Sequence, residues 1–432
     1  MSLWTDLSFW DNPYSTDAIP GSDQGSKLFV GRSRELAILR RQITSSSAHT
    51  TLEGPNGVGK SSLVAVACHR MLQEFRAEGA TQLFLPLKNS ISVTPGLTSE
   101  VLGEKVLLEV AQAFVDCHDE LTRAGREVPE INELNAWLNN AVLKGRGGGV
   151  TVLGSGASGS TALSANTSHG FARSGLMRKV LEGINSAFAS REHGGFVAVL
   201  DNVELAGSPS QARALLEAMR DPYMSIPGLR WVMCGARGVL RGACGSSRLS
   251  GVLGQPVEIK PLDASHAPAV VETRIEVYRA HHDAYGPVDG RGFLALFELN
   301  RGNLRTALEH CEQFSSWAYD NARLPETPEP SDVRLALLSD WIRELCAGHL
   351  EAVEGVAETG WLLFDELVKR GGLAYVGDIG ASSDGSRRRR KRDLDGLEDA
   401  GLIQRWTSPD DRRRRSVNVT ATGWLVRVAR TG

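Results

Sequence analysis

Residues 54–61, with the sequence Gly-Pro-Asn-Gly-Val-Gly-Lys-Ser, restrict the fold of this 432-residue chain more than any other stretch. They match the pattern G-x-x-x-x-G-K-[ST], in which glycines let the backbone curl until its N–H groups converge on phosphate oxygens. Lys60 supplies a positive charge for the outer phosphates, and Ser61 supplies a hydroxyl for Mg²⁺. The residues expected to bind the cofactor ATP are Gly54, Pro55, Asn56, Gly57, Val58, Gly59, Lys60, Ser61 and Ser62.

The residues around this loop predict the strand–loop–helix order that the motif requires. Residues 49–53 are interpreted as a short buried strand, and residues 62–68 are typical of a helix whose positive end faces the anion. An apolar run, residues 196–201, ends in Asp201. A buried parallel strand would deliver that carboxylate to the edge of the sheet where the loop lies. Ser61 and Asp201 are therefore the predicted Mg²⁺ ligands.

Composition indicates a globular protein with two or three domains. Hydrophobic residues make up 41% of the sequence and charged residues 23%. No apolar run reaches the roughly 18 residues of a membrane span, and residues 1–6 lack the layout of a signal peptide. Six scattered cysteines include no C-x-x-C pair, which favours reduced thiols and no zinc site. We expect a cytoplasmic protein with no membrane partner.

The net charge of −3 is unevenly distributed along the chain. Residues 360–432 hold 15 Lys and Arg against 10 Asp and Glu, whereas the remainder of the chain is acidic. A basic C-terminal region on an acidic body is typical of a region that meets a polyanion.

The segment around Val30 and Arg32 resembles the one that packs over adenine in AAA+ ATPases and in the related STAND class of NTPases. In those proteins it also lies just upstream of the phosphate loop. The resemblance implies that Val30 and Arg32 lie at the nucleotide. It also implies a polar sensor after the predicted strand 229–235, here Arg237, and an arginine of the helical lid, here Arg305. A third arginine, Arg248, matches the finger that reaches a neighbouring subunit, which implies self-association through the ATPase core.

The residue after Asp201 departs from the AAA+ pattern. AAA+ proteins usually carry a glutamate there to polarise the attacking water, but this chain has Asn202, with Glu204 two positions later. Asparagine can orient water but cannot accept its proton. Either Glu204 serves as the base, or hydrolysis is slow and the protein is a nucleotide-gated switch.

A stretch rich in Gly, Ser and Thr, about residues 145–170, interrupts the predicted core. It contains a formal G-x-G-x-x-G at residues 154–159. No helix pattern opens there and no acidic residue follows about 20 positions later, so a dinucleotide site is rejected. We expect a loop or hairpin inserted into the ATPase core.

The basic C-terminal region resembles a winged helix-turn-helix. A predicted helix over residues 386–400 begins with six basic residues, and a predicted hairpin follows whose tip holds four arginines. In that class the helix enters the major groove by its N-terminal end and the wing lies against the backbone. So many arginines predict binding to double-stranded DNA with little sequence preference. The alternative is a protein-contact domain with solvated arginines. The predicted DNA-binding residues are Arg387, Arg388, Arg389, Arg390, Lys391, Arg392, Arg412, Arg413, Arg414 and Arg415.

Taken together, residues 28–432 resemble an AAA+ ATPase of the origin-recognition or initiator type. The expected fold class is α/β: a P-loop core with a parallel sheet flanked by helices, an all-α lid and a C-terminal winged helix domain. The expected divisions are an extended arm (1–27), the ATPase core (28–260), the lid (261–323), a linker (324–332) and the winged helix-turn-helix domain (333–432).

Three functions fit this resemblance. The first is an ATPase, slow if Glu204 is not the base, whose nucleotide state controls DNA or partner binding. The second is a STAND-like signalling or anti-phage defence ATPase that switches a separate effector protein through the winged helix. The third, a weaker match, is an ATPase that selects target DNA for transposition. The sequence carries no recognised effector motif, so any effector must be another chain.

Overall fold

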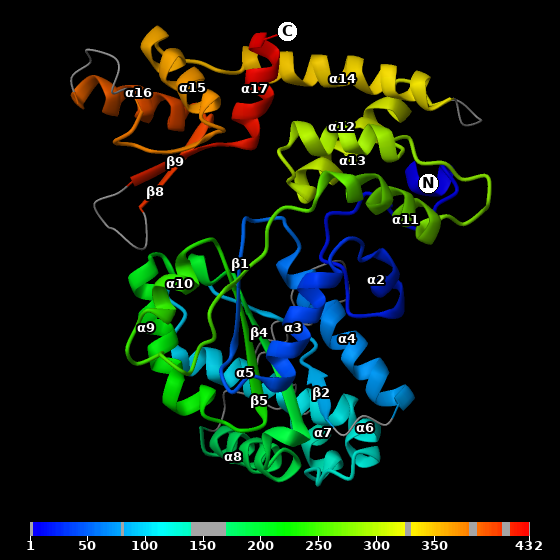
Figure 1. Ribbon diagram of the computed structural model, residues 1–432. Coiled ribbons are helices and arrows are strands. Elements are labelled where there is room, and N and C mark those ends of the chain that lie inside the picture. The colour runs from blue at the N-terminus through cyan, green and yellow to red at the C-terminus, as the bar shows by residue number, and fades with distance from the viewer. Residues whose placement is uncertain are drawn as a thin grey trace, which may run out of the picture.

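The computed structural model describes residues 3–78, 82–139, 170–324, 330–379, 387–407 and 415–431 (Figure 1). Most of the predicted insertion at 145–170, most of the linker and the hairpin tip therefore lie outside the described residues. Within the described part, no helix is long and apolar enough to cross a membrane.

One parallel sheet forms the centre of the N-terminal half. Its strands are β1 (Thr50–Glu53), β2 (Leu83–Pro86), β4 (Gly194–Asp201), β5 (Leu229–Gly235) and β6 (Val257–Glu258), in the spatial order β2-β4-β5-β1-β6. A two-residue strand, β3 (Ile91–Ser92), pairs with the end of β4 and was not predicted. The strands predicted at 49–53, 196–201 and 229–235 thus correspond to β1, β4 and β5, and the predicted α/β fold class is confirmed.

Helices cover both faces of this sheet (Figure 1). The strands are buried on both sides, so alternate residues face two different cores. Val197 and Val232 pack with α3 (Ser33–Ser45) and α4 (Lys60–Glu78). Phe196 and Trp231 face the second core. The helices of that second layer are α5 (Ser99–Asp116), α6 (His118–Arg123), α7 (Ile131–Asn139), α8 (Gly170–Ala187), α9 (Pro209–Met219) and α10 (Val239–Cys244).

Three helices form the predicted lid: α11 (Ala267–Tyr278), α12 (Gly290–Leu299) and α13 (Leu304–Asp320). Asp289 caps α12 by accepting the Gly292 N–H, and Asn303 caps α13 by accepting the Thr306 N–H. Phe293 and Phe314 are central to a separate apolar core in this layer.

The N-terminal arm is not extended throughout, as the sequence had led us to expect. It contains the short helices α1 (Leu3–Asp6) and α2 (Asp23–Leu28). Phe9 and Tyr14 are fully buried, and Trp4 contacts both rings edge to face. Aromatic burial against the lid core therefore folds a segment whose sequence lacks periodicity.

The C-terminal part contains α14 (Ser331–Glu351), α15 (Glu358–Lys369), β7 (Leu373–Tyr375), α16 (Arg387–Asp399), β8 (Ile403–Thr407), β9 (Arg415–Val419) and α17 (Ala421–Thr431). Its strands form an antiparallel sheet in the order β7-β9-β8. Leu394 and Leu397 of α16 are buried in its core. Asp378 and Ile379 lie in a turn after β7.

Candidate nucleotide-binding site and basic surface

The loop between β1 and α4 adopts a backbone that only glycine takes up easily. Gly57 has φ of +80° and Gly59 has φ of +91°. Lys60 is largely buried, and its Nζ donates to the Gly54 carbonyl at 2.9 Å and to the Pro55 carbonyl at 3.1 Å. The ammonium group is thus folded back over the loop. The Ser62 hydroxyl accepts the backbone N–H of Ile19 from the N-terminal arm at 3.0 Å.

The two predicted metal ligands are in direct contact. The Ser61 hydroxyl donates to Asp201 Oδ2 at 2.5 Å, and Asp201 Oδ1 accepts the Asn202 N–H at 2.9 Å. Topology explains the contact: β1 and β4 flank β5 in a parallel sheet, so their C-terminal ends share one edge. A hydroxyl and a carboxylate are hard oxygen donors of the kind that Mg²⁺ prefers, and they fit that ion.

The charged groups of the site converge on the end of β5. Burial raises the pKa of the Cys234 thiol, the Asp201 carboxylate raises it further, the Lys60 ammonium lowers it, and the Glu204 carboxylate raises it again. All three charged groups therefore affect the pKa of one buried thiol on β5. Lys60, Asp201 and Glu204 lie around one point of the sheet edge.

Asn202 and Glu204 are held in different directions. Asn202 has a left-handed backbone with φ of +55°, a conformation that asparagine tolerates, and its amide Nδ2 donates to Ser92 of β3 at 2.9 Å. Glu204 lies in a 3-10 turn, Val203–Ala206, and its Oε2 accepts the Ala236 N–H at the end of β5 at 2.9 Å. The Glu204 side chain therefore links the C-terminal ends of β4 and β5, whereas the Asn202 side chain is hydrogen-bonded to β3.

The segment upstream of the loop supports it from the lid side. Arg32 is buried, and its guanidinium donates to the Val58 carbonyl at 3.2 Å and to Glu35 at 3.0 Å. Val30 packs against the lid core. Between them Gly31, with φ of +74°, lies so close to His266 that a Cβ would be 2.8 Å from its ring. The segment thus fills the junction between loop and lid.

Arg305 is beside the phosphate loop. A Cβ placed on Gly57 would lie 2.7 Å from Asn303 Oδ1 and 3.1 Å from Arg305 Cβ. The turn before α13 therefore touches the glycine that the loop motif requires. Asn303 is also the N-cap of α13, and a Gly-Asn pair before a helix is typical of such a cap.

The other two predicted arginines lie at the surface. Arg237 follows β5 but pairs with Glu258 of β6 at 2.8 Å, with 64% of its side chain exposed. Arg248, 57% exposed, pairs with Asp221 at 3.7 Å. Neither arginine contacts Ser61 or Asp201 in the described part of the chain.

Glu53, the last residue of β1, is a buried charge that the sequence interpretation missed. It is 1% exposed, its Oε1 accepts the Arg241 N–H of α10 at 2.7 Å, and its Oε2 has no partner among the described residues. A charged residue at the end of a predicted buried strand was the signal. Glu53 joins the base of the phosphate loop to α10.

The basic residues of α16 form a surface at its N-terminal end. Arg387, Arg388, Arg389, Lys391 and Arg392 are exposed, and Arg390 is half-buried. Arg412, Arg413 and Arg414 lie outside the described residues. Arg415 begins β9, although its side chain is likewise outside them. Arg405 differs from these residues, because it pairs with Asp395 and Glu398 of α16 and holds β8 to that helix.

The lid also contacts the C-terminal part directly. The Arg301 guanidinium lies 3.9 Å from the centroid of the Trp424 ring of α17. Arg301 adopts φ of +53°, an uncommon backbone for a non-glycine residue. The turn 300–305 thus reaches the phosphate loop through Asn303 and the C-terminal part through Arg301.

No protein-family model matches this chain, and no curated protein matches it. Solved structures do. The Aeropyrum pernix ORC1 protein in complex with DNA is 15% identical, covers 99% of each chain and has a TM-score of 0.44. The Aeropyrum pernix ORC2 protein with ADPNP and ADP is 12% identical, covers 98% of each chain and has a TM-score of 0.47. Cdc6p from Pyrobaculum aerophilum is 14% identical, covers 98% of this chain and 97% of its own, and has a TM-score of 0.38.

Proposed function

We propose that this chain binds Mg-ATP at its phosphate loop, hydrolyses it, and uses its nucleotide state to control DNA binding by the C-terminal part. The observation that carries the proposal is the 2.5 Å contact between Ser61 and Asp201 at the mouth of a loop that needs two glycines with positive φ. Two distant segments of chain supply the oxygen ligands that a nucleotide-bound Mg²⁺ takes.

Each residue of the site has a task in this proposal. Lys60, whose ammonium donates to the Gly54 and Pro55 carbonyls, offers that group to the outer phosphates. Ser61 and Asp201 hold Mg²⁺, which supplies charge neutralisation at the phosphate oxygens. Arg32 positions the loop through the Val58 carbonyl. The lid residue Arg305 lies where it can contact phosphate oxygens and report their presence to the lid.

We assign the base to Glu204. Its carboxylate is anchored at the end of β5 and carries the proton-accepting oxygens that Asn202 lacks. Asn202 orients water from the β3 side. Slow turnover would be expected if Glu204 were not the base, because Asn202 cannot accept a proton. Arg237 completes the sensor at β5, and Arg248 acts on the site of a second copy of this chain.

We assign the C-terminal part to the winged helix-turn-helix class, in which α16 is the recognition helix. The assignment is supported by the order helix, strand, helix, two strands and helix, and by the antiparallel sheet beside α16. The exposed cations at the start of α16, together with Arg412, Arg413, Arg414 and Arg415, would neutralise phosphates of double-stranded DNA. Low sequence preference follows from contacts made mainly to the backbone.

One observation favours the STAND-like alternative. The Asn202 amide donates to Ser92 and is not a proton acceptor, so a switch with little hydrolysis is chemically sufficient at this site. In that case the C-terminal part would contact an effector protein, and the arginines of α16 would be dispensable for nucleic acid.

Duplex binding across a salt series separates the two functions. We would measure fluorescence anisotropy of a labelled duplex with ATP, with ADP and without nucleotide. The test variant replaces Arg387, Arg388 and Arg389 with Ser, and the control is Arg343→Ser, an exposed arginine of α14. The DNA function predicts weaker binding and a salt slope that is shallower by about 0.9 for each phosphate no longer neutralised, with the control unchanged. Equal affinities for test and control variants would reject it.

A further inference from the structure

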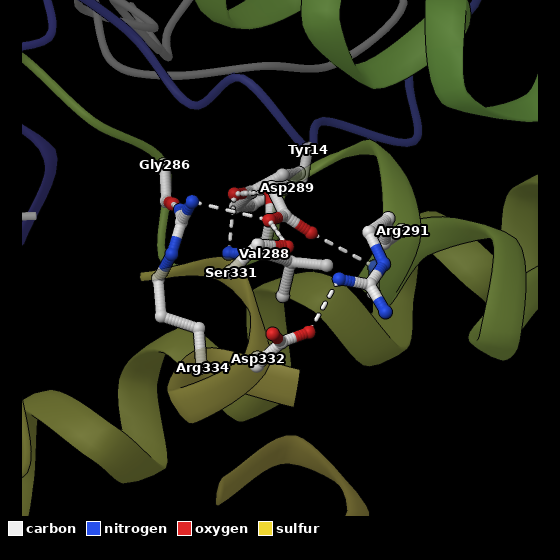
Figure 2. Close-up of polar contacts among 9 residues, drawn as sticks. Tyr14, Gly286, Val288, Asp289, Arg291, Ser331, Asp332 and Arg334 are labelled. Atoms are coloured by element: carbon white, nitrogen blue, oxygen red, sulfur yellow. Dashed lines mark hydrogen bonds and ion pairs between the residues drawn. The ribbon is translucent and has the colours of Figure 1, made fainter. Parts of the chain in front are cut away.

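The N-terminal arm is fixed inside the lid by a tyrosine. The Tyr14 side chain is fully buried, and its hydroxyl donates to the Val288 carbonyl at 2.7 Å and accepts the Val288 N–H at 2.9 Å (Figure 2). Arg274 of α11, also buried, donates to the carbonyls of Pro13 and Ser15 at 3.3 and 3.0 Å. Backbone and side chain of the arm are therefore both tied to lid residues.

The same arm is fixed to the phosphate-loop helix a few residues later. The Ile19 N–H donates to Ser62, which follows the predicted metal ligand Ser61. Gly21 approaches the Ala65 carbonyl so closely that a Cβ would be 2.8 Å from it, and Asp23 pairs with His69 at 2.9 Å. From position 14 to position 19 an extended chain spans at most ~17 Å. The connection between the lid and α4 can therefore be no longer than this.

The lid segment that holds Tyr14 also holds the start of α14. Asp289 Oδ1 caps α12, and its Oδ2 accepts the Ser331 hydroxyl at 2.5 Å and Arg334 Nη2 at 3.1 Å (Figure 2). Arg334 Nη1 donates to the Gly286 carbonyl at 3.1 Å. Residues 286–289 are thus hydrogen-bonded to the arm through Tyr14 and to α14 through Ser331 and Arg334.

Helix α14 belongs to two cores. Leu338 and Trp341, in its first half, are buried in the lid core. Leu350, near its end, packs against the C-terminal core, and α14 is in contact with α17. Figure 1 shows α17 beside one end of α14. A shift of the first turn of α14 therefore moves the body that carries the cations of α16.

We propose that the arm is a coupling strap of the nucleotide switch: Tyr14 and Ile19 link helix α4 to residues 286–289, and Asp289 passes the displacement to α14 through Ser331 and Arg334. Tyr14 is a positioning residue in this scheme, since it acts through Val288 and Asp289. The inference rests on the proposed function only in requiring that nucleotide binds at the loop. It adds a defined route by which that binding reaches the C-terminal part.

Hydrogen exchange of the full chain, with and without a non-hydrolysable ATP analogue, tests the route. Tyr14→Phe removes the hydroxyl and keeps the buried ring. Tyr319→Phe is the matched control, because its hydroxyl also joins arm and lid, by donating to Asp6, but on the exposed surface and off the route. Asp289→Asn is a second variant, in which asparagine still caps α12 while the charge facing Arg334 is removed.

In the wild type we expect the analogue to slow exchange at residues 57–66, at 284–292 and at 331–338. In Tyr14→Phe and in Asp289→Asn the effect at 57–66 should persist, while the effect at 331–338 falls at least threefold. The double variant should lose no more than either single one, because both interrupt the same route. Tyr319→Phe should match the wild type.

Two outcomes overturn the inference, and they are distinct. Protection at 57–66 without any change at 331–338 in the wild type, or full protection at 331–338 in both variants, rejects the strap while leaving nucleotide binding intact. Absence of protection at 57–66 in the wild type rejects nucleotide binding itself, and the strap with it.

Discussion

At the scale of single residues, the chemistry of the site depends on which side-chain oxygen atoms can bind a metal ion or accept a proton. Asp201 is committed to Ser61 and to its own neighbour's N–H, and Asn202 donates its amide to Ser92. Glu204 is the carboxylate whose anchor, the Ala236 N–H, occupies only one of its two oxygens. Its assignment as base can therefore be tested without disturbing the metal ligands.

Glu204→Gln should abolish ATP turnover while leaving nucleotide affinity within about twofold of the wild type. Glutamine keeps an oxygen for the Ala236 N–H, so the 3-10 turn is preserved, but it cannot accept a proton. Loss of a general base typically lowers the rate about 10² to 10⁴-fold. Phosphate release measured beside Glu276→Gln, an exposed control, checks this; unchanged turnover would show that another group is the base.

At the scale of elements, the lid turn 300–305 is where several constraints meet. Asn300 Nδ2 donates to the Leu296 carbonyl at 2.8 Å and to His310 Nδ1 at 3.0 Å. The network assigns His310 as the neutral tautomer with its proton on Nε2. Burial, and then the charge of His349, lowers the pKa of His310 to about 4. The turn therefore depends on an imidazole that stays uncharged.

Acid should weaken the lid for this reason. The pKa of His310 in the fold lies below its ordinary value of 6.5, so the unfolded chain binds more protons between pH 6.5 and about 4. The contribution is complete above pH 6.5 and is lost as the pH falls through that window, at up to about 1.4 kcal/mol per pH unit. Urea unfolding at pH 7 and pH 5 should show a smaller loss in His310→Gln than in the wild type. An exposed control, His282→Gln, should behave as wild type; the same loss in His310→Gln as in wild type would contradict the assignment.

Arg301 stores backbone strain in the same turn. Arg301→Ala should destabilise the chain more than Arg301→Gly, by about 1 kcal/mol, because both remove the guanidinium from the Trp424 ring but only glycine relieves the positive φ. Urea midpoints of the two variants measure the difference. A larger loss in the glycine variant would contradict the presence of backbone strain at position 301.

The elements best predicted from sequence are those with local causes. Continuous apolar runs ending at Asp201 and Gly235 marked β4 and β5, and the phosphate-loop motif marked the start of α4. β3 was missed because two residues carry no periodicity, and it proved to position Asn202. Buried contacts between distant segments also had no local signal. Tyr14 and Val288 are 274 positions apart in the chain, and the sequence around each residue has no pattern that predicts their contact.

At the scale of the whole molecule, the nucleotide site is incomplete in one copy if Arg248 acts in trans. The phosphate loop, Asp201 and Arg305 belong to one end of the sheet and the adjoining lid, whereas Arg248 is exposed and pairs with Asp221 on the same copy. An exposed arginine held by a single 3.7 Å ion pair is readily released, because such surface pairs contribute at most about 1 kcal/mol. Its role then depends on which groups of a second copy lie next to the released guanidinium.

Mixing two inactive variants tests this arrangement. Arg248→Ala should retain ATP affinity and lose turnover by about 10³-fold, as for removal of an arginine that stabilises transferred phosphoryl charge. Lys60→Ala should lose ATP binding but keep its Arg248. In a mixture, the intact loop of one variant meets the intact arginine of the other, so turnover should recover to a large fraction of one active site per pair. An equal mixture that stays as slow as its components, or an Arg248→Ala protein as fast as wild type, would place Arg248 outside the reaction. Arg343→Ala is the control, because it breaks a different surface pair, that of Arg343 with Asp340. This variant should keep its turnover, and mixing it with Lys60→Ala should give no turnover beyond its own.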